Sequence, residues 1–251
     1  MPDAVRRPPS ARGAATLSRS VALLSAFRQE QSRPDVFYSA LAEDAVTQIM
    51  TYQELAGATV LDVGAGPGWF RRAFEAHDAR YLGLDADAGE MGAAALPQDA
   101  SVLGDAQALP FRTGALDVVF SSNVLEHVPH PELMADEMVR VTRPGGLVFL
   151  SYTLWLSPWG GHETSPWHYL GGHRAAHRYT ATHGHPPKNV FGDSLFALSA
   201  QRMLRWSRSC EDVVVLAEIP RYHPWWAHWV MRVPGLRELV AWNLLLVLRR
   251  R

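Results

Sequence analysis

The sequence predicts an α/β fold organised around a mostly parallel sheet. Between residues 59 and 152, short apolar segments typical of strands alternate with segments that have apolar residues at helical spacing. This alternation predicts parallel strands joined by right-handed crossovers. The length of 251 residues suits one large α/β domain. A hydrophobic content of 47% is enough for a sizeable core.

The alternating region defines most of the expected sheet. The expected strands are 59–63, 80–84, 101–103, 115–121 and 147–152, and the expected helices are 69–77, 88–96 and a segment that begins at Pro131. Before this region, helices are expected over 17–27 and 37–55, separated by Pro34. After it, we expect a helix over 195–206 and a strand over 213–219.

The apolar run 242–248 has two interpretations. It is too short to cross a bilayer as a helix, but it could lie in a membrane interface as an anchor. It also suits a central strand that is covered on both faces. We favour the strand, paired antiparallel with 213–219.

One domain is expected over residues 17–251. Residues 1–16 are rich in Arg, Pro, Ser and Ala but lack the apolar core of a secretion signal, so they predict a disordered tail. The lone Cys210 excludes a disulfide within the chain. A net charge of -1 gives no overall field that favours nucleic acid or an anionic membrane. The expected location is the cytoplasm.

A glycine-rich turn follows the first expected strand, which ends near Asp62. The glycines at 64, 66 and 68 allow a tight turn and the close approach of a ligand. A dinucleotide-binding loop needs a small residue where Trp69 stands, so the pattern argues against NAD. Asp85 ends the second expected strand, about 20 residues further on, where a carboxylate can bind a ribose diol. The alternative for Asp85 is a solvated turn residue.

Five ordered motifs resemble those of class I S-adenosylmethionine (SAM)-dependent methyltransferases. They are Val60–Phe70, Gly83–Asp87, Gly104–Phe111, Leu116–Val128 and Arg143–Gly146. The resemblance covers about residues 58–152 and is closest to the branch that acts on small molecules. The flanking segments, including Ser157–Glu163, look similar to an uncharacterised group of actinobacterial methyltransferases. It implies a Rossmann-like, seven-stranded class I methyltransferase sheet with helices on both faces. It also implies an N-terminal helical cap over 17–57 and a lid insertion over 153–190 at the carboxyl end of the sheet.

The resemblance also places the cofactor SAM on this chain. The methionine end of SAM would lie against Asp62, Gly64, Ala65, Gly66 and Gly68, with Asn123 and Val124 on the amino-acid side. The ribose would lie against Asp85 and Ala86. The adenine would lie against Asp105, Ala106 and Gln107. Tyr38 of the cap is expected to contact the cofactor as well. The alternative for Asp105 is a cap on the next turn.

The reaction expected from the resemblance needs little from the protein beyond alignment of donor and acceptor, because SAM carries an activated methyl group. A hydroxyl acceptor also needs a base. The candidate bases are His127, His162, Glu163 and His168; the alternative for each is a purely structural role. We favour oxygen as the methylated atom. No metal site is expected, because neither His183 with His185 nor the histidines near Glu163 show a convincing ligand spacing.

Aromatic residues concentrate in the segments outside the five motifs. They are Tyr38, Trp155, Trp159, Trp167, Tyr169, Trp225, Trp226 and Trp229. Because ligands of open parallel sheets lie beyond the carboxyl ends of the strands, these residues predict an aromatic lid over a small apolar, amphipathic or lipid-like acceptor. The alternative is that they only pack the insertions onto the sheet.

Three other functions compete with that of a small-molecule methyltransferase. A nucleic-acid enzyme would typically have an Asn- or Asp-Pro-Pro-aromatic loop where Ser121–Val124 stands, so no nucleic-acid partner is expected. A non-catalytic SAM-binding regulator is disfavoured by the intact motifs. A peripheral membrane enzyme with a lipid-linked acceptor would use the aromatic segment 225–242.

Overall fold

The computed structural model of the chain describes residues 15–30, 32–94, 96 and 99–251. Most of the tail expected over residues 1–16 therefore lies outside the described residues. The last two of these are placed: Ala15 is buried, and its carbonyl accepts a hydrogen bond from the Trp225 amide at 2.7 Å. The Thr16 hydroxyl caps the first helix by accepting from the Arg19 amide at 3.1 Å.

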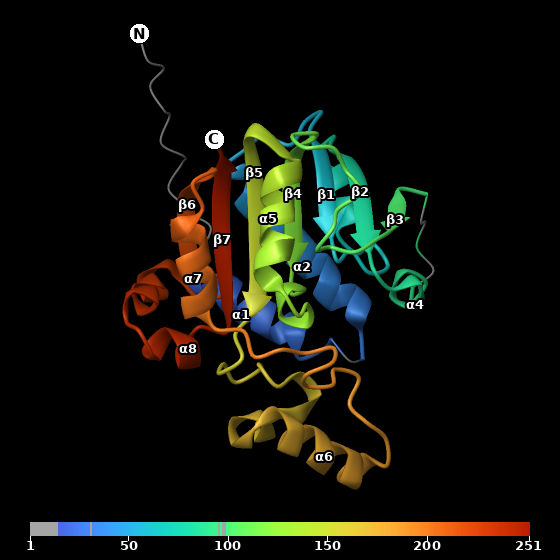
Figure 1. Cartoon of the computed structure of the whole chain (residues 1–251), viewed down its shortest axis with the longest axis vertical. Coiled ribbons are helices and arrows are strands. Elements are labelled where there is room, and N and C mark those ends of the chain that lie inside the picture. Colours follow the sequence, from blue (N-terminus) through green and yellow to red (C-terminus); the bar gives the residue numbers. More distant parts are fainter. Residues whose placement is uncertain (1–14, 31, 95, 97–98) are drawn as a thin grey trace.

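Seven strands in the described part of the chain form one mixed sheet with the order β3-β2-β1-β4-β5-β7-β6 (Figure 1). They are β1 Thr59–Val63, β2 Arg80–Asp85, β3 Ser101–Leu103, β4 Leu116–Ser122, β5 Thr142–Thr153, β6 Val213–Pro220 and β7 Asn243–Arg250. Strands β1 to β5 pair in parallel, and β7 is antiparallel to both of its neighbours. The predicted α/β sheet is confirmed, and so is the interpretation of 242–248 as a buried strand, since Leu244 to Leu248 are fully buried.

Helices cover both faces of this sheet. The α-helices are α1 Leu17–Phe27, α2 Pro34–Met50, α3 Arg71–Glu75, α4 Ala88–Met91, α5 Pro131–Val141, α6 Gly172–His183, α7 Ala200–Ser209 and α8 Leu236–Val240. Short 3-10 turns are η1 Leu125–His127, η2 His162–Thr164, η3 Trp167–Leu170 and η4 Trp225–Arg232.

Two apolar cores form because successive strand residues point to opposite faces. In β4, Val118 and Phe120 pack with α2 and α3, whereas Val119 packs with α5 and α7. Tyr152 of β5 lies in the second core and donates a hydrogen bond to the Ser199 carbonyl at 3.0 Å. The sheet is therefore a rigid layer from which the loops at its carboxyl edge project.

Several predicted helix boundaries were wrong for local reasons. The helix expected over 37–55 begins at Pro34, because the first helical turn needs no amide hydrogen from that residue. The helix expected over 195–206 begins at Ala200, since the Ser199 hydroxyl caps it by accepting from the Arg202 amide.

Two further helices are shorter than expected. The helix expected over 69–77 is only α3, Arg71–Glu75, because the glycine turn extends through Phe70. The helix expected over 88–96 ends at Met91, immediately before Gly92. The strand expected over 147–152 is longer than expected, because β5 already starts at Thr142.

Three segments from outside the five motifs meet at the carboxyl edge of the parallel strands, where Figure 1 shows α6 beyond the ends of β4 and β5. The ring of Trp159 in the lid insertion lies 5.0 Å from that of Phe27 in α1 and 6.3 Å from that of Trp242 beside β7. The expected convergence of cap, lid and carboxyl-terminal segment on one edge is therefore present. None of the helices in the described part of the chain is both long and apolar enough to span a membrane.

Candidate active site

The glycine-rich loop after β1 borders open space. Its glycines at 64, 66 and 68 have φ values of +79°, +51° and +91°, which side chains disfavour. A Cβ added to Gly66 or Gly68 would meet no heavy atom within 4 Å. A Cβ on Gly64 would lie 2.2 Å from Cγ2 of Val124. The loop is therefore open to a ligand at two glycines and closed at the third by Val124.

Two carboxylates flank this loop. Asp62 is buried, and its Oδ2 accepts a hydrogen bond from the Tyr81 hydroxyl at 2.8 Å. Burial raises the pKa of Asp62 to about 7; the Tyr81 hydrogen bond opposes this rise, and the charge of Asp85 adds to it. Asp85 accepts from the amides of Gly66, at 2.8 Å, and Asp87, at 3.0 Å, one on each oxygen. Because a carboxylate oxygen has two lone pairs, both oxygens can still accept a ribose hydroxyl.

The adenine side of the expected site lies after β3. Asp105 is exposed, and its Oδ1 accepts from the Gln107 amide at 2.8 Å, so it caps the next turn as one alternative proposed. A cap of this kind leaves lone pairs on the carboxylate for a ligand. Ala106 is buried between these two residues, and Ala86 follows Asp85 at the end of β2.

Asn123 and Val124 follow β4 on the other side of the loop. Asn123 has a φ of +59°, and its Oδ1 accepts from Nδ2 of Asn243 in β7 at 2.6 Å. Its Nδ2 lies 3.5 Å from the Tyr222 hydroxyl. The loop after β4 is thus held by β7 through Asn123 and by the glycine loop through Val124.

Tyr38 brings α2 over the glycine loop. Its ring stacks on Trp69, with centroids 5.5 Å apart and planes 10° from parallel. Its hydroxyl donates to Glu30 at 3.0 Å. Burial raises the pKa of the Tyr38 hydroxyl well above its ordinary value, and the Glu30 charge adds to this rise. The phenol therefore stays protonated near neutral pH.

The four candidate bases have different surroundings. His168 is buried, with Nε2 3.1 Å from the Ser157 carbonyl and Nδ1 3.4 Å from the Ser165 hydroxyl, so both ring nitrogens have structural partners. Glu163 accepts from Asn189 Nδ2 at 2.8 Å within the lid.

The other two candidates come together. Ligand atoms of His127 and His162 lie within 4.8 Å of one another and of an oxygen of buried Glu126. Burial lowers the pKa of His162 to about 4, and the charge of Glu126 opposes this effect. His162 is therefore neutral near pH 7 and keeps a lone pair that can bind an electrophile.

The aromatic residues of the insertions fall into two groups. Some pack the insertions together, as Trp159 does with Phe27, and as Trp155 does with Phe191 at 4.7 Å. Others are roughly half exposed, and these are Trp167, Tyr169, Trp225, Trp226 and Trp229. Packing therefore explains only part of the aromatic content.

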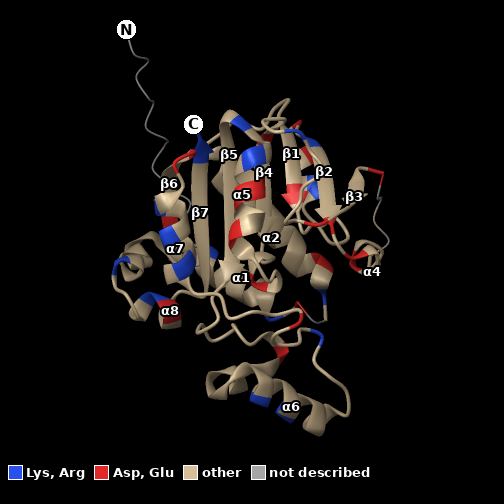
Figure 2. Cartoon of the chain, viewed as in Figure 1, with Lys and Arg blue, Asp and Glu red and all other residues tan. Residues whose placement is uncertain are grey.

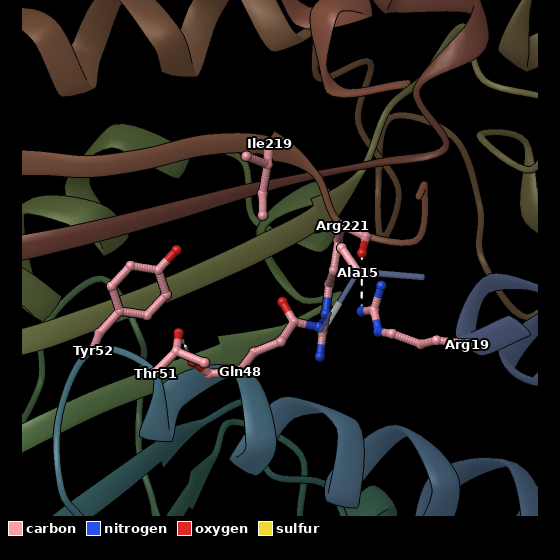
Figure 3. Close-up of a pocket in the computed structure, with 7 residues that line it drawn as sticks. All are labelled: Ala15, Arg19, Gln48, Thr51, Tyr52, Ile219 and Arg221. Atoms are coloured by element: carbon pink, nitrogen blue, oxygen red, sulfur yellow. Dashed lines mark hydrogen bonds between the residues drawn. The ribbon is translucent and has the colours of Figure 1, made fainter. Parts of the chain in front are cut away.

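One buried cation near this edge was not anticipated. Arg221 is 1% exposed, and its Nη1 donates to the hydroxyls of Ser122, at 2.7 Å, and Ser151, at 2.5 Å. Figure 3 shows its side chain beside Arg19 and Gln48, around a cavity of about 20 Å³. Within the described part of the chain its Nε and Nη2 have no hydrogen-bond partner, and the cavity suits about one water molecule. Nothing near Arg221 in the sequence signals this burial.

Comparison with known proteins identifies the family. An uncharacterized methyltransferase of Mycolicibacterium gilvum (strain PYR-GCK) is 54% identical, over 94% of this chain and 96% of that protein. This chain belongs to the same family of methyltransferases. A second uncharacterized methyltransferase, from Mycobacteroides abscessus, is 50% identical over 94% of this chain and 96% of its own. The methyltransferase domain family matches residues 61–150.

Solved structures share the fold of this methyltransferase. A geranyl diphosphate methyltransferase in complex with SAM superposes with a TM-score of 0.55 at 16% identity, covering 92% of this chain and 90% of that one. A SAM-dependent methyltransferase from Mesorhizobium loti gives a TM-score of 0.54 at 20% identity, covering 83% of this chain and 98% of that one. The class I SAM-dependent methyltransferase fold implied by the motifs is confirmed.

Proposed function

We propose that this methyltransferase transfers the methyl group of SAM to a small apolar or amphipathic acceptor, with oxygen as the favoured acceptor atom. The observation that carries the proposal is the glycine loop, which is open at Gly66 and Gly68 and flanked by Asp62 and Asp85. When bound, SAM supplies a sulfonium-activated methyl group. The residues of the chain have to bind, orient and enclose it.

The two carboxylates fit different parts of SAM. Asp62 is a buried carboxyl whose hydrogen bond comes from the uncharged Tyr81 hydroxyl, so the ammonium of the methionine end would favour its charged form. Asp85 has lone pairs for the ribose hydroxyls. Asp105, with the backbone of Ala106 and Gln107, remains the proposed adenine side.

The proposed acceptor class rests on the insertions. They converge beyond the carboxyl ends of the strands, where open α/β sheets bind ligands. Half-exposed Trp167 and Tyr169 offer apolar surface there. His127 and His162 lie together beside the loop after β4, and an imidazole near the acceptor suits one that must lose a proton, such as a hydroxyl.

Basic side chains on α7 do not suggest a nucleic-acid surface. Figure 2 shows them beside acidic residues, and Arg202 pairs with Glu132 at 2.5 Å while Arg208 pairs with Glu218. We therefore keep nucleic acid out of the proposal.

Calorimetric titration of SAM and S-adenosylhomocysteine tests the proposal. Asp85→Ala should weaken binding at least about 10-fold, because hydrogen bonds to a charged group contribute about 1.5–3 kcal/mol. Asp35→Ala, which removes an exposed carboxylate from the first turn of α2, is the matched control and should bind normally. Equal affinity in Asp85→Ala, or no binding by folded wild type, would overturn the proposal. Binding without turnover on any acceptor would favour the non-catalytic regulator.

One observation favours a second candidate, a peripheral membrane enzyme acting on a lipid-linked acceptor. Trp225, Trp226 and Trp229 of η4 are 46%, 56% and 52% exposed, and Leu239 of α8 is 50% exposed. Tryptophan is enriched at membrane interfaces. Wild type should then float with anionic vesicles, and the Trp226→Ala/Trp229→Ala variant should float less. A wild type that stays entirely with the unbound fraction would refute this candidate.

A further inference from the structure

A cluster of three metal-ligand side chains lies beside the glycine loop. Glu126 and His127 belong to η1, directly after β4, and His162 begins η2 in the lid. One oxygen of Glu126 and one nitrogen of each histidine lie within 4.8 Å of one another. Val124, which closes the glycine loop at Gly64, precedes Glu126 by two residues. The cluster therefore joins the lid to the edge of the proposed cofactor site.

Two polar atoms of the cluster have no hydrogen-bond partner among the described residues. Glu126 is 1% exposed, and its Oε2 is buried without a hydrogen bond. Nε2 of His162 is likewise buried without a hydrogen bond from or to any described residue. The other Glu126 oxygen, Oε1, accepts from the Thr153 amide at 3.0 Å, which fixes the carboxylate. Because unpaired buried polar atoms are rare and unfavourable, these two point to a missing ligand.

His127 is oriented as a metal ligand would be. Its Nδ1 lies 2.7 Å from the Ser194 carbonyl. A carbonyl can only accept, so Nδ1 carries the hydrogen and Nε2 of the neutral ring carries the lone pair. Metal-binding histidines are commonly held in this way by a carbonyl on the second nitrogen.

The backbone of His162 holds its ring beside that of His127. Its φ of +48° is uncommon for a residue with a side chain and persists only where the surroundings enforce it. Its amide donates to the Trp159 carbonyl at 2.9 Å, and its carbonyl accepts from the Ser165 amide at 3.1 Å. In this conformation its ring centroid lies 5.0 Å from that of His127.

We propose that Glu126, His127 and His162 bind a divalent transition metal ion of the Zn²⁺ class. Two imidazole nitrogens and one carboxylate, with at least one open position, form a recurring set for such ions. Tetrahedral Zn²⁺ with bonds of about 2.0–2.2 Å separates its ligand atoms by roughly 3.4 Å. The side chains therefore have to close from at most 4.8 Å, a change within the reach of small rotations. Mg²⁺, which prefers oxygen ligands, should bind poorly.

The ion would fasten the lid insertion to the loop after β4. The open coordination position of the ion would take an acceptor oxygen. This role in the reaction rests on the proposed function, whereas binding of the ion does not. An acceptor hydroxyl would release its proton to solvent there. Its oxygen would then form the new C–O bond while the C–S bond of SAM breaks and the electron pair stays on sulfur.

Titration of metal-stripped protein with Zn²⁺ by calorimetry, and with Co²⁺ by visible absorption, tests the site. No SAM is added, so a failure of the proposed function leaves this result readable. Two variants remove ligands. Glu126→Gln keeps the side-chain shape and an oxygen for the Thr153 amide, and His162→Gly removes the ring while relieving the positive φ. The control, His183→Ala/His185→Ala, removes two exposed histidines at the end of α6.

Wild type and control should bind one ion per chain, and both ligand variants should bind at least about 10-fold more weakly, since loss of even an outer-shell partner commonly costs 10–100-fold. Amide hydrogen exchange around η2 and η3 should slow when Zn²⁺ binds. No uptake by folded wild type would mean that water alone fills the cluster, and would overturn the proposal. So would equal affinity in wild type and both ligand variants, or loss of binding in the control.

Discussion

Replacing Gly64 with alanine should destabilise this methyltransferase through two separate effects. The backbone there has a φ of +79°, and a left-handed conformation costs an L-residue about 1–2 kcal/mol. The new Cβ would also lie 2.2, 2.6 and 2.9 Å from three carbons of Val124. Overpacking of this kind typically costs about 1–3 kcal/mol. The free energy of unfolding should therefore fall by about 2–5 kcal/mol, a large share of the about 5–15 kcal/mol of a typical domain.

Urea denaturation of four variants separates the two effects. Gly66→Ala is the matched control, because its φ is +51° but its Cβ meets nothing within 4 Å, so it should lose only about 1–2 kcal/mol. The double variant Gly64→Ala/Val124→Ala removes the two closest contacts, at 2.2 and 2.6 Å, and keeps only the contact at 2.9 Å with the Cβ of residue 124. It should lose about 1–3 kcal/mol less than the sum of its single variants. Equal losses in Gly64→Ala and Gly66→Ala, or no coupling with Val124→Ala, would refute the reasoning.

Two further predictions concern charged groups. The pKa of Asp62 is about 7 in the folded protein and about 3.9 unfolded, so the folded state binds more protons between these values. Relative to that of Asp62→Asn, the unfolding free energy of wild type should fall by about 4 kcal/mol as the pH rises from about 4 to 7, and should then level off. If the unfolding free energies of wild type and Asp62→Asn changed in parallel with pH, this prediction would be wrong. Lys188 of the lid pairs with Glu90 of α4 at 2.8 Å, with both side chains well exposed. Lys188→Ala should lower the free energy of unfolding by less than about 1 kcal/mol but should speed amide hydrogen exchange around residue 188. Unchanged exchange would show that the ion pair does not hold the lid.

The sheet could be predicted because its signals are local. Each strand is a short apolar run, and the antiparallel strand β7 was recognised because it is apolar on both faces and too short to span a membrane. The ends of helices were predicted less well. Whether Pro34 breaks a helix or begins one depends on which side of it the chain turns, and the pattern of apolar residues does not record this.

The same distinction applies to the site. The glycine loop, Asp62 and Asp85 lie within one unit formed by β1, the glycine turn, α3 and β2, so their spacing along the chain already carries their geometry. Arg221 is buried by contacts with two strands and the cap. His162 meets Glu126 only because the lid folds back over β4. Contacts of this kind depend on the complete fold and leave no spacing signal.

The position of β7 has a consequence for synthesis. This strand lies between β5 and β6, although it follows both along the chain. Asn243 at the start of β7 comes 90 positions after Thr153 at the end of β5, and a ribosome adding about 5–20 residues per second needs roughly 5–18 s to reach it. Through that interval the fully apolar segment Leu147–Leu150 is an open strand edge, a template to which other chains can pair. Because of the order of the strands, we expect this edge to stay unpaired for those seconds, when a chaperone would protect it most effectively.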